Sequence, residues 1–122
     1  MNYTAFIVLA LVATGVGAQP PRQDYPGCNL AEQHRVTGEI GGSIIDARQA
    51  HISVRANILQ ADIGTARKAR RLTESQSDRL WRRVDGVRKA ADGYVHRQDF
   101  LSAAERASYD RELDRIARPV CR

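Results

Sequence analysis

Residues 72–89, LTESQSDRLWRRVDGVRK, and residues 101–118, LSAAERASYDRELDRIAR, carry the same structural signals 29 positions apart. In each segment a Thr or Ser at the N-cap position of a helix is followed three residues later by Gln or Glu. The longer side chain can accept a hydrogen bond from the backbone of the cap, which completes a capping box. The two predicted boxes are Thr73 with Gln76 and Ser102 with Glu105. The repeat therefore predicts two helices that begin in the same way.

Both predicted helices also carry an apolar stripe in the same register. Apolar residues recur at spacings of 4, 3 and 4, which places them on one face of a helix. The stripes are Leu80, Val84, Val87 and Ala91 in the first copy, and Tyr109, Leu113, Ile116 and Val120 in the second. We expect both stripes to be buried. The first helix should span 74–95, weakened at Gly93, and the second should end at Arg118, before Pro119.

The chain before the repeat predicts one short and one long helix. A short helix over 29–36 would be capped by Asn29, with Glu32 three residues later. Ser43 is the expected cap of a helix over 44–70. Its expected stripe is Ile45, Ile52, Ala56, Leu59, Ile63 and Ala66. No segment shows sustained alternation, so we predict an all-α bundle of three or four helices.

The N-terminal residues resemble an export signal. An apolar run from Ala5 to Ala13 is followed by small residues up to Ala18, the pattern that a signal peptidase recognises. We therefore predict a signal peptide over 1–18, a flexible proline-rich lead over 19–27, and one helical domain over 28–122. The expected location is periplasmic or secreted, with no stable membrane span after cleavage. A retained anchor is the alternative, although the apolar run is short for one.

Cys28 and Cys121 are the only cysteines, and they flank nearly the whole predicted domain. Since an exported protein meets an oxidising compartment, the pair predicts a structural disulfide that joins the two ends of the bundle. A reactive thiol or a zinc ligand is the weaker alternative, because neither cysteine has a CxxC partner or a clustered His.

No residue set in the sequence indicates catalysis. His34, His51 and His96 lack the spacing of a zinc motif, and no GxSxG nucleophile motif occurs. The carboxylates Asp110, Glu112 and Asp114 lie among arginines and are expected to form surface ion pairs. We therefore predict no catalytic residue, no metal site and no cofactor.

Positive charge is the second functional signal. Lys and Arg total 19 against 14 Asp and Glu, which gives a net charge of +5. The candidate anion-binding residues gather near Trp81 and are Arg79, Arg82, Arg83 and Arg88. The alternative is an ordinary solvated helix face with i, i+4 ion pairs, and Trp81 in a partly buried position. The expected pairs are Asp78 with Arg82, Asp85 with Lys89, and Asp114 with Arg118.

The motif Leu72-Thr73-x-x-Gln76, with a relaxed version at Leu101, Ser102 and Glu105, resembles the LTxxQ repeat of small periplasmic proteins of the Spy and CpxP type. The resemblance implies a helical, non-enzymatic protein with a chaperone-like or envelope-stress role and an unidentified protein client. The alternative expectation is an Arg-rich module that binds an anionic envelope component, either lipopolysaccharide, anionic lipid or nucleic acid. A homodimer is left open.

Overall fold

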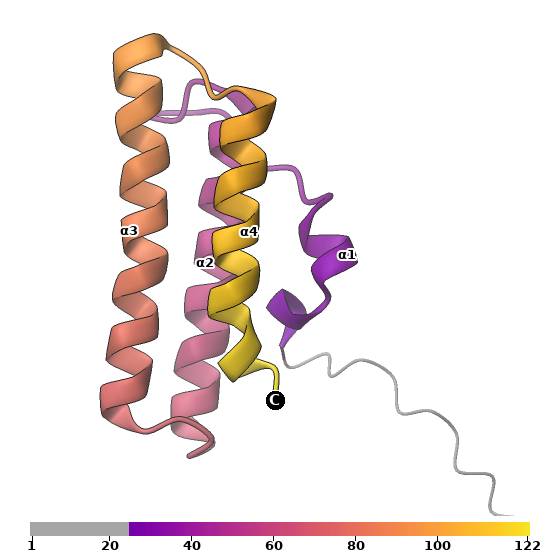
Figure 1. Cartoon of the computed structure of the whole chain (residues 1–122), viewed down its shortest axis with the longest axis vertical. Helices are drawn as coiled ribbons and strands as arrows, with labels where there is room; N and C mark the ends of the chain where they lie inside the picture. The colour runs from indigo at the N-terminus through magenta and orange to yellow at the C-terminus, as the bar shows by residue number, and fades with distance from the viewer. Residues whose placement is uncertain (1–24) are drawn as a thin grey trace, which may run out of the picture.

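The computed structural model describes residues 25–122, and the structural statements below concern this part of the chain. Three long helices lie side by side and alternate in direction (Figure 1). They are α2 (Ala47–Lys68), α3 (Glu74–Gln98) and α4 (Ala103–Val120), preceded by a 3-10 turn at Pro26–Cys28 and the one-turn helix α1 (Leu30–Gln33). Among these residues no strand forms, so the predicted all-α bundle is confirmed. The predicted signal peptide and most of the predicted lead lie outside the described residues.

Both predicted capping boxes are formed. The Thr73 hydroxyl accepts a hydrogen bond from the backbone N–H of Gln76 at 3.1 Å, and the Thr73 N–H donates to Gln76 Oε1 at 2.9 Å. Ser102 and Glu105 repeat this exchange at 3.1 and 2.8 Å. Each box pairs donors at the helix start that have no partner within the helix. The repeated motif therefore fixes where α3 and α4 begin.

The two apolar stripes pack with α2 to form the core. All residues of both stripes are buried except Tyr109, which is half-buried at the edge. The contribution of α2 is Ile52, Ala56, Leu59, Ile63 and Ala66. The prediction that Ile45 belongs to this stripe is wrong, because Ile45 precedes α2 and is 54% exposed.

The start of α2 differs from the prediction. Ser43 does not cap the helix, because residues 41–44 form a tight turn with Gly42 at a φ of +58°. Asp46 is the actual cap, and its carboxylate accepts the backbone N–H groups of Arg48 and Gln49 at 3.1 and 3.0 Å. Because of this turn the helix begins only at Ala47, directly after Asp46, whose Oδ2 accepts both N–H groups.

Other helix ends also differ from the prediction. α3 continues through Gly93 to Gln98, since the buried residues Ala91 and Val95 on either side hold the helix against the core. α4 includes Pro119 in its last turn. The first helix is capped by Asn29 as predicted, but it ends at Gln33 rather than at Val36.

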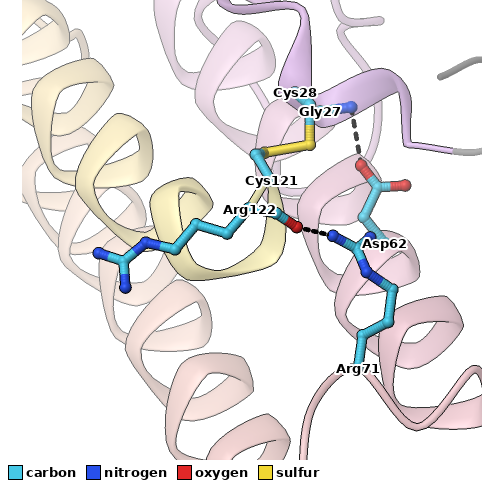
Figure 2. Close-up of a disulfide and its surroundings, with 6 residues drawn as sticks. All are labelled: Gly27, Cys28, Asp62, Arg71, Cys121 and Arg122. Carbon is cyan, nitrogen blue, oxygen red and sulfur yellow. Dashed lines mark hydrogen bonds between the residues drawn. A yellow bond between two sulfur atoms is a disulfide. The ribbon is translucent and has the colours of Figure 1, made fainter. Parts of the chain in front are cut away.

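Cys28 and Cys121 form the predicted disulfide between the 3-10 turn and the end of α4 (Figure 2). Their Cα atoms lie 5.5 Å apart, and the bond spans a sequence separation of 93 residues. The chain-entropy model gives about 4 to 5 kcal/mol of stabilisation for a loop of this size. Tyr25 is also buried, and the guanidinium of Arg71 lies 4.8 Å from its ring centroid. The last residues of the predicted lead, from Tyr25 onward, therefore belong to the folded domain.

Candidate functional site

The alternating helices concentrate positive charge at one end of the bundle. α2 ends, α3 begins and α4 ends at the lower end in Figure 1. We define the basic end as residues 67–83 together with residues 115–122. It contains ten basic residues and two acidic ones, whereas the rest of the chain contains nine basic and twelve acidic residues. The basic residues are Arg67, Lys68, Arg70, Arg71, Arg79, Arg82, Arg83, Arg115, Arg118 and Arg122.

The structure divides the four predicted anion-binding arginines into two groups. Arg88 is committed to the fold, because it contacts Asp85 at 3.0 Å and the side-chain oxygens of Asn57 and Gln60 at 2.7 and 2.6 Å. Arg83 donates to Glu112 at 2.9 Å. Arg79 and Arg82 are exposed and form no ion pair or side-chain hydrogen bond with residues 25–122. Only these two of the predicted set are available to a ligand without breaking a contact.

Two of the three expected i, i+4 pairs are not formed. Asp85 and Lys89 pair at 2.9 Å as predicted. Asp78 and Arg82 do not pair, and Asp114 contacts Arg55 and His34 instead of Arg118. The helix face around Arg79 is therefore less neutralised than the sequence pattern indicates. The prediction that Trp81 is partly buried is also wrong, since it is 46% exposed beside these arginines.

Two open recesses adjoin Arg79. The first has a volume of about 340 Å³ and combines apolar and polar lining residues, which are Leu72, Gln76, Arg79, Leu80, Arg83 and Pro119. The second is polar and is lined by Glu74, Ser75, Asp78, Arg79 and Arg82. Arg79 thus lines both the first, partly apolar recess and the second, polar recess.

A second cluster of charges is centred on the buried Arg55 and reaches the surface at His34, whose side chain is 47% exposed, and the sequence analysis missed it. Arg55 donates to Asp110 at 2.7 Å and to Asp114 at 2.8 Å, although its side chain is only 2% exposed. His51 contacts Asp110 at 2.8 Å, and His34 contacts Asp114 at 2.8 Å. We call these five residues the buried ion network. The prediction of a surface pair is wrong for Asp110. Asp114 pairs both with the buried Arg55 and with the exposed His34. Glu112 does pair at the surface with Arg83 and Arg115.

Hydrogen bonding keeps Asp110 ionised. Burial alone would raise the pKa of this carboxyl, but the hydrogen bonds and positive charges of His51 and Arg55 outweigh burial, so its pKa is lowered. His51 Nδ1 lies 2.7 Å from the carbonyl oxygen of Val36, which can only accept. His51 Nε2 lies 2.8 Å from Oδ1 of Asp110. The network thereby ties the segment before α2 to α2 and α4.

Asp62 lies beside the disulfide and is bonded differently. Its Oδ2 accepts one hydrogen bond, from the backbone N–H of Gly27 at 2.7 Å (Figure 2). Burial raises the pKa of Asp62, and the single hydrogen bond from Gly27 opposes this only in part. A Cβ at Gly27 would lie 2.6 Å from Oδ2, so Gly is required for this approach. Asp62 anchors the 3-10 turn and has no cationic partner among the described residues.

The described residues contain no group of three or more His, Cys, Asp or Glu side chains that could hold a metal ion. None of the helices within residues 25–122 is long and apolar enough to cross a membrane. His34 and His51 each contact a carboxylate that Arg55 also holds. These ion pairs therefore hold α2, α4 and the segment before α2 together.

The chain matches no family model, no curated protein and no solved structure.

Proposed function

We propose that this chain is a non-enzymatic binding module whose basic end contacts the phosphate groups of an anionic envelope amphiphile. The observation that carries the proposal is the separation of charge, with ten basic residues against two acidic ones in residues 67–83 and 115–122. Seven of these basic residues form no ion pair within the described chain, namely Lys68, Arg70, Arg71, Arg79, Arg82, Arg118 and Arg122. The envelope location rests on the predicted export signal.

The basic end suits a phosphate-bearing surface for two physical reasons. Guanidinium groups bind phosphate through paired N–H donors, and seventeen of the nineteen basic residues in the chain are arginines. Each Arg or Lys near an anionic lipid surface contributes about 1 kcal/mol. Because three helix ends present their side chains together, several of these contributions can act at once.

The chaperone-like role expected from the resemblance stays a prediction. Both apolar stripes are used in the core, and the large exposed apolar side chains are Leu30, Ile40, Ile45, Trp81, Tyr94 and Phe100. A chaperone-like activity would use some of these residues to hold an unfolded client. Suppression of client aggregation at equimolar protein, unchanged by salt, would support that role instead of anion binding.

Vesicle binding tests the proposal directly. The protein is mixed with vesicles of phosphatidylglycerol or of phosphatidylcholine, and the bound fraction is measured by sedimentation as salt rises from about 50 to about 500 mM. We expect binding to phosphatidylglycerol alone, with a steep loss at high salt. Equal binding to both lipids, or no binding at low salt, would contradict the proposal. Tighter binding to a DNA duplex at the same salt would favour the nucleic-acid alternative.

A further inference from the structure

The recess between Arg79 and Pro119 gives the basic end a feature that a purely electrostatic surface lacks. Its floor is the outer edge of the core, formed by Leu72 and Leu80 at 7% exposure each, and Pro119 closes it from α4. Its volume of about 340 Å³ lies within the range of small-molecule sites, about 300–1,000 Å³. An anion held only by charge would leave this apolar floor in contact with water.

Polar groups line one side of the same recess. Gln76, Arg79 and Arg83 follow one another at spacings of three and four residues, so they share one face of α3 with Leu80. Arg79 has no partner among the described residues. Gln76 uses its Oε1 in the capping box, while its Nε2 makes no hydrogen bond within residues 25–122. Two donors are therefore available beside the apolar floor.

Arg83 differs from Arg79 because it is partly neutralised. It donates to Glu112, and this hydrogen bond is the main reason that the pKa of Glu112 is lowered. Both side chains of the pair remain partly exposed. The free positive charge of the recess thus lies at Arg79, toward the start of α3.

We propose that this recess binds an amphiphile with a single anionic head and one unbranched apolar chain, such as the phosphate monoester of an alkyl chain. The head would lie at Arg79 and Gln76 Nε2, and the chain would cover Leu72, Leu80 and Pro119. This inference rests on the proposed function and adds a ligand class to it, since the charged surface alone has no preference for an apolar chain. Nucleic acid has no alkyl chain that could cover the apolar floor.

Chain-length dependence is the measurable consequence. Each buried methylene contributes about 0.8 kcal/mol, which corresponds to about a fourfold gain in affinity. Because the recess is open on one side, we expect about a two- to fourfold gain for each added methylene until the chain fills the recess. Inorganic phosphate should bind far more weakly than decyl phosphate.

The experiment is a calorimetric titration of the protein with inorganic phosphate and with hexyl, octyl and decyl phosphate below their micelle concentrations. Arg79→Gln should weaken decyl phosphate binding at least fivefold, while Arg111→Gln should change it less than twofold, because Arg111 is exposed, forms no ion pair within residues 25–122 and lies outside the basic end. Both substitutions replace exposed side chains, and thermal unfolding verifies that each variant folds. Methyl NMR adds the location: shifts should appear at Leu72 and Leu80 and not at Ile45.

Failure of the recess as an amphiphile site can be distinguished from failure of the proposed function. Equal affinity for all chain lengths, or equal losses in Arg79→Gln and Arg111→Gln, would overturn the recess as an amphiphile site. If phosphatidylglycerol vesicles still bind under those conditions, the proposed function stands without it. Methyl shifts confined to the opposite end of the bundle would also overturn the inference.

Discussion

Arg55 and Arg79 show two opposite uses of the same side chain in one small domain. Arg55 is 2% exposed and both of its terminal nitrogens are held by carboxylates of α4. Arg79 is exposed, lies between two recesses and has no partner within the described residues. The first arginine can only be structural, because any ligand would have to displace Asp110 and Asp114. The comparison shows that the net charge of +5 says little about binding until the paired arginines are set aside.

The largest expected effect comes from exchanging these two arginines for methionine, one at a time. Arg55→Met would leave Asp110 and Asp114 buried without their main cationic partner, which should cost about 3 to 5 kcal/mol in the free energy of unfolding. Arg79→Met should change stability by less than about 0.5 kcal/mol. Urea unfolding measures both. Similar losses in the free energy of unfolding for Arg55→Met and Arg79→Met would contradict the structural role assigned to Arg55.

Two buried aspartates, Asp110 with cationic partners and Asp62 without them, extend the comparison between paired and unpaired charges. Asp110→Asn should cost about 3 kcal/mol at neutral pH, because Arg55 and His51 would lose the charged acceptor between them. Asp62→Asn keeps an acceptor for the Gly27 N–H and removes a buried charge, so it should leave stability unchanged or raise it by about 1 kcal/mol.

The difference in stability between each variant and the wild type should change with pH in opposite directions for Asp110→Asn and Asp62→Asn. The pKa of Asp110 is lowered, so its contribution to stability is present above the ordinary Asp range, about 4, and is lost as pH falls through its folded value. The gap between wild type and Asp110→Asn should therefore close in acid. The pKa of Asp62 is raised, so its contribution is lost as pH rises, and any advantage of Asp62→Asn should grow with pH. Unfolding curves between pH 3 and 7 that show parallel trends for both variants would contradict these charge states.

The helix caps give a smaller effect that separates stability from binding. Thr73→Ala and Ser102→Ala should each cost about 1 kcal/mol, because each removes the acceptor for one backbone N–H at a helix start. The losses should add, since the caps begin different helices. Thr73 lies within the basic end and Ser102 does not, yet neither variant should lose vesicle affinity in its folded state. Loss of binding at an unchanged thermal midpoint would make the cap a ligand contact.

Local signals predicted the parts of this protein that depend on short sequence spacing. The caps at Thr73 and Ser102, the stripes of α3 and α4, and the disulfide were all correctly predicted. The sequence also contained a signal for the buried ion network, since His51 and Arg55 on one helix and Asp110 and Asp114 on another both have i, i+4 spacing. Their pairing required knowing which helix faces meet, and the contacts span 55 or more residues.

The errors at Ile45 and Trp81 have different causes. Ile45 was assigned to the stripe of a helix that begins only at Ala47. Trp81 was expected to be partly buried because of its large apolar ring, but its exposure depends on the surroundings that the other elements provide. The basic end was likewise visible only in part. Residues 67–83 are continuous in the sequence, but residues 115–122 join them only through the antiparallel arrangement of the three helices (Figure 1).

The most direct test of the central claim compares two double variants that lose the same charge at different places. Arg79→Gln with Arg82→Gln removes two cations from the basic end, whereas Arg35→Gln with Arg111→Gln removes two exposed cations elsewhere that also lack an ion-pair partner within residues 25–122. The measurement is the affinity for phosphatidylglycerol vesicles at fixed salt. We expect about a thirtyfold loss for the first pair, from about 1 kcal/mol per Arg, and less than about a threefold loss for the second. Equal losses would mean that only net charge matters, and the assignment of binding to the basic end would be contradicted.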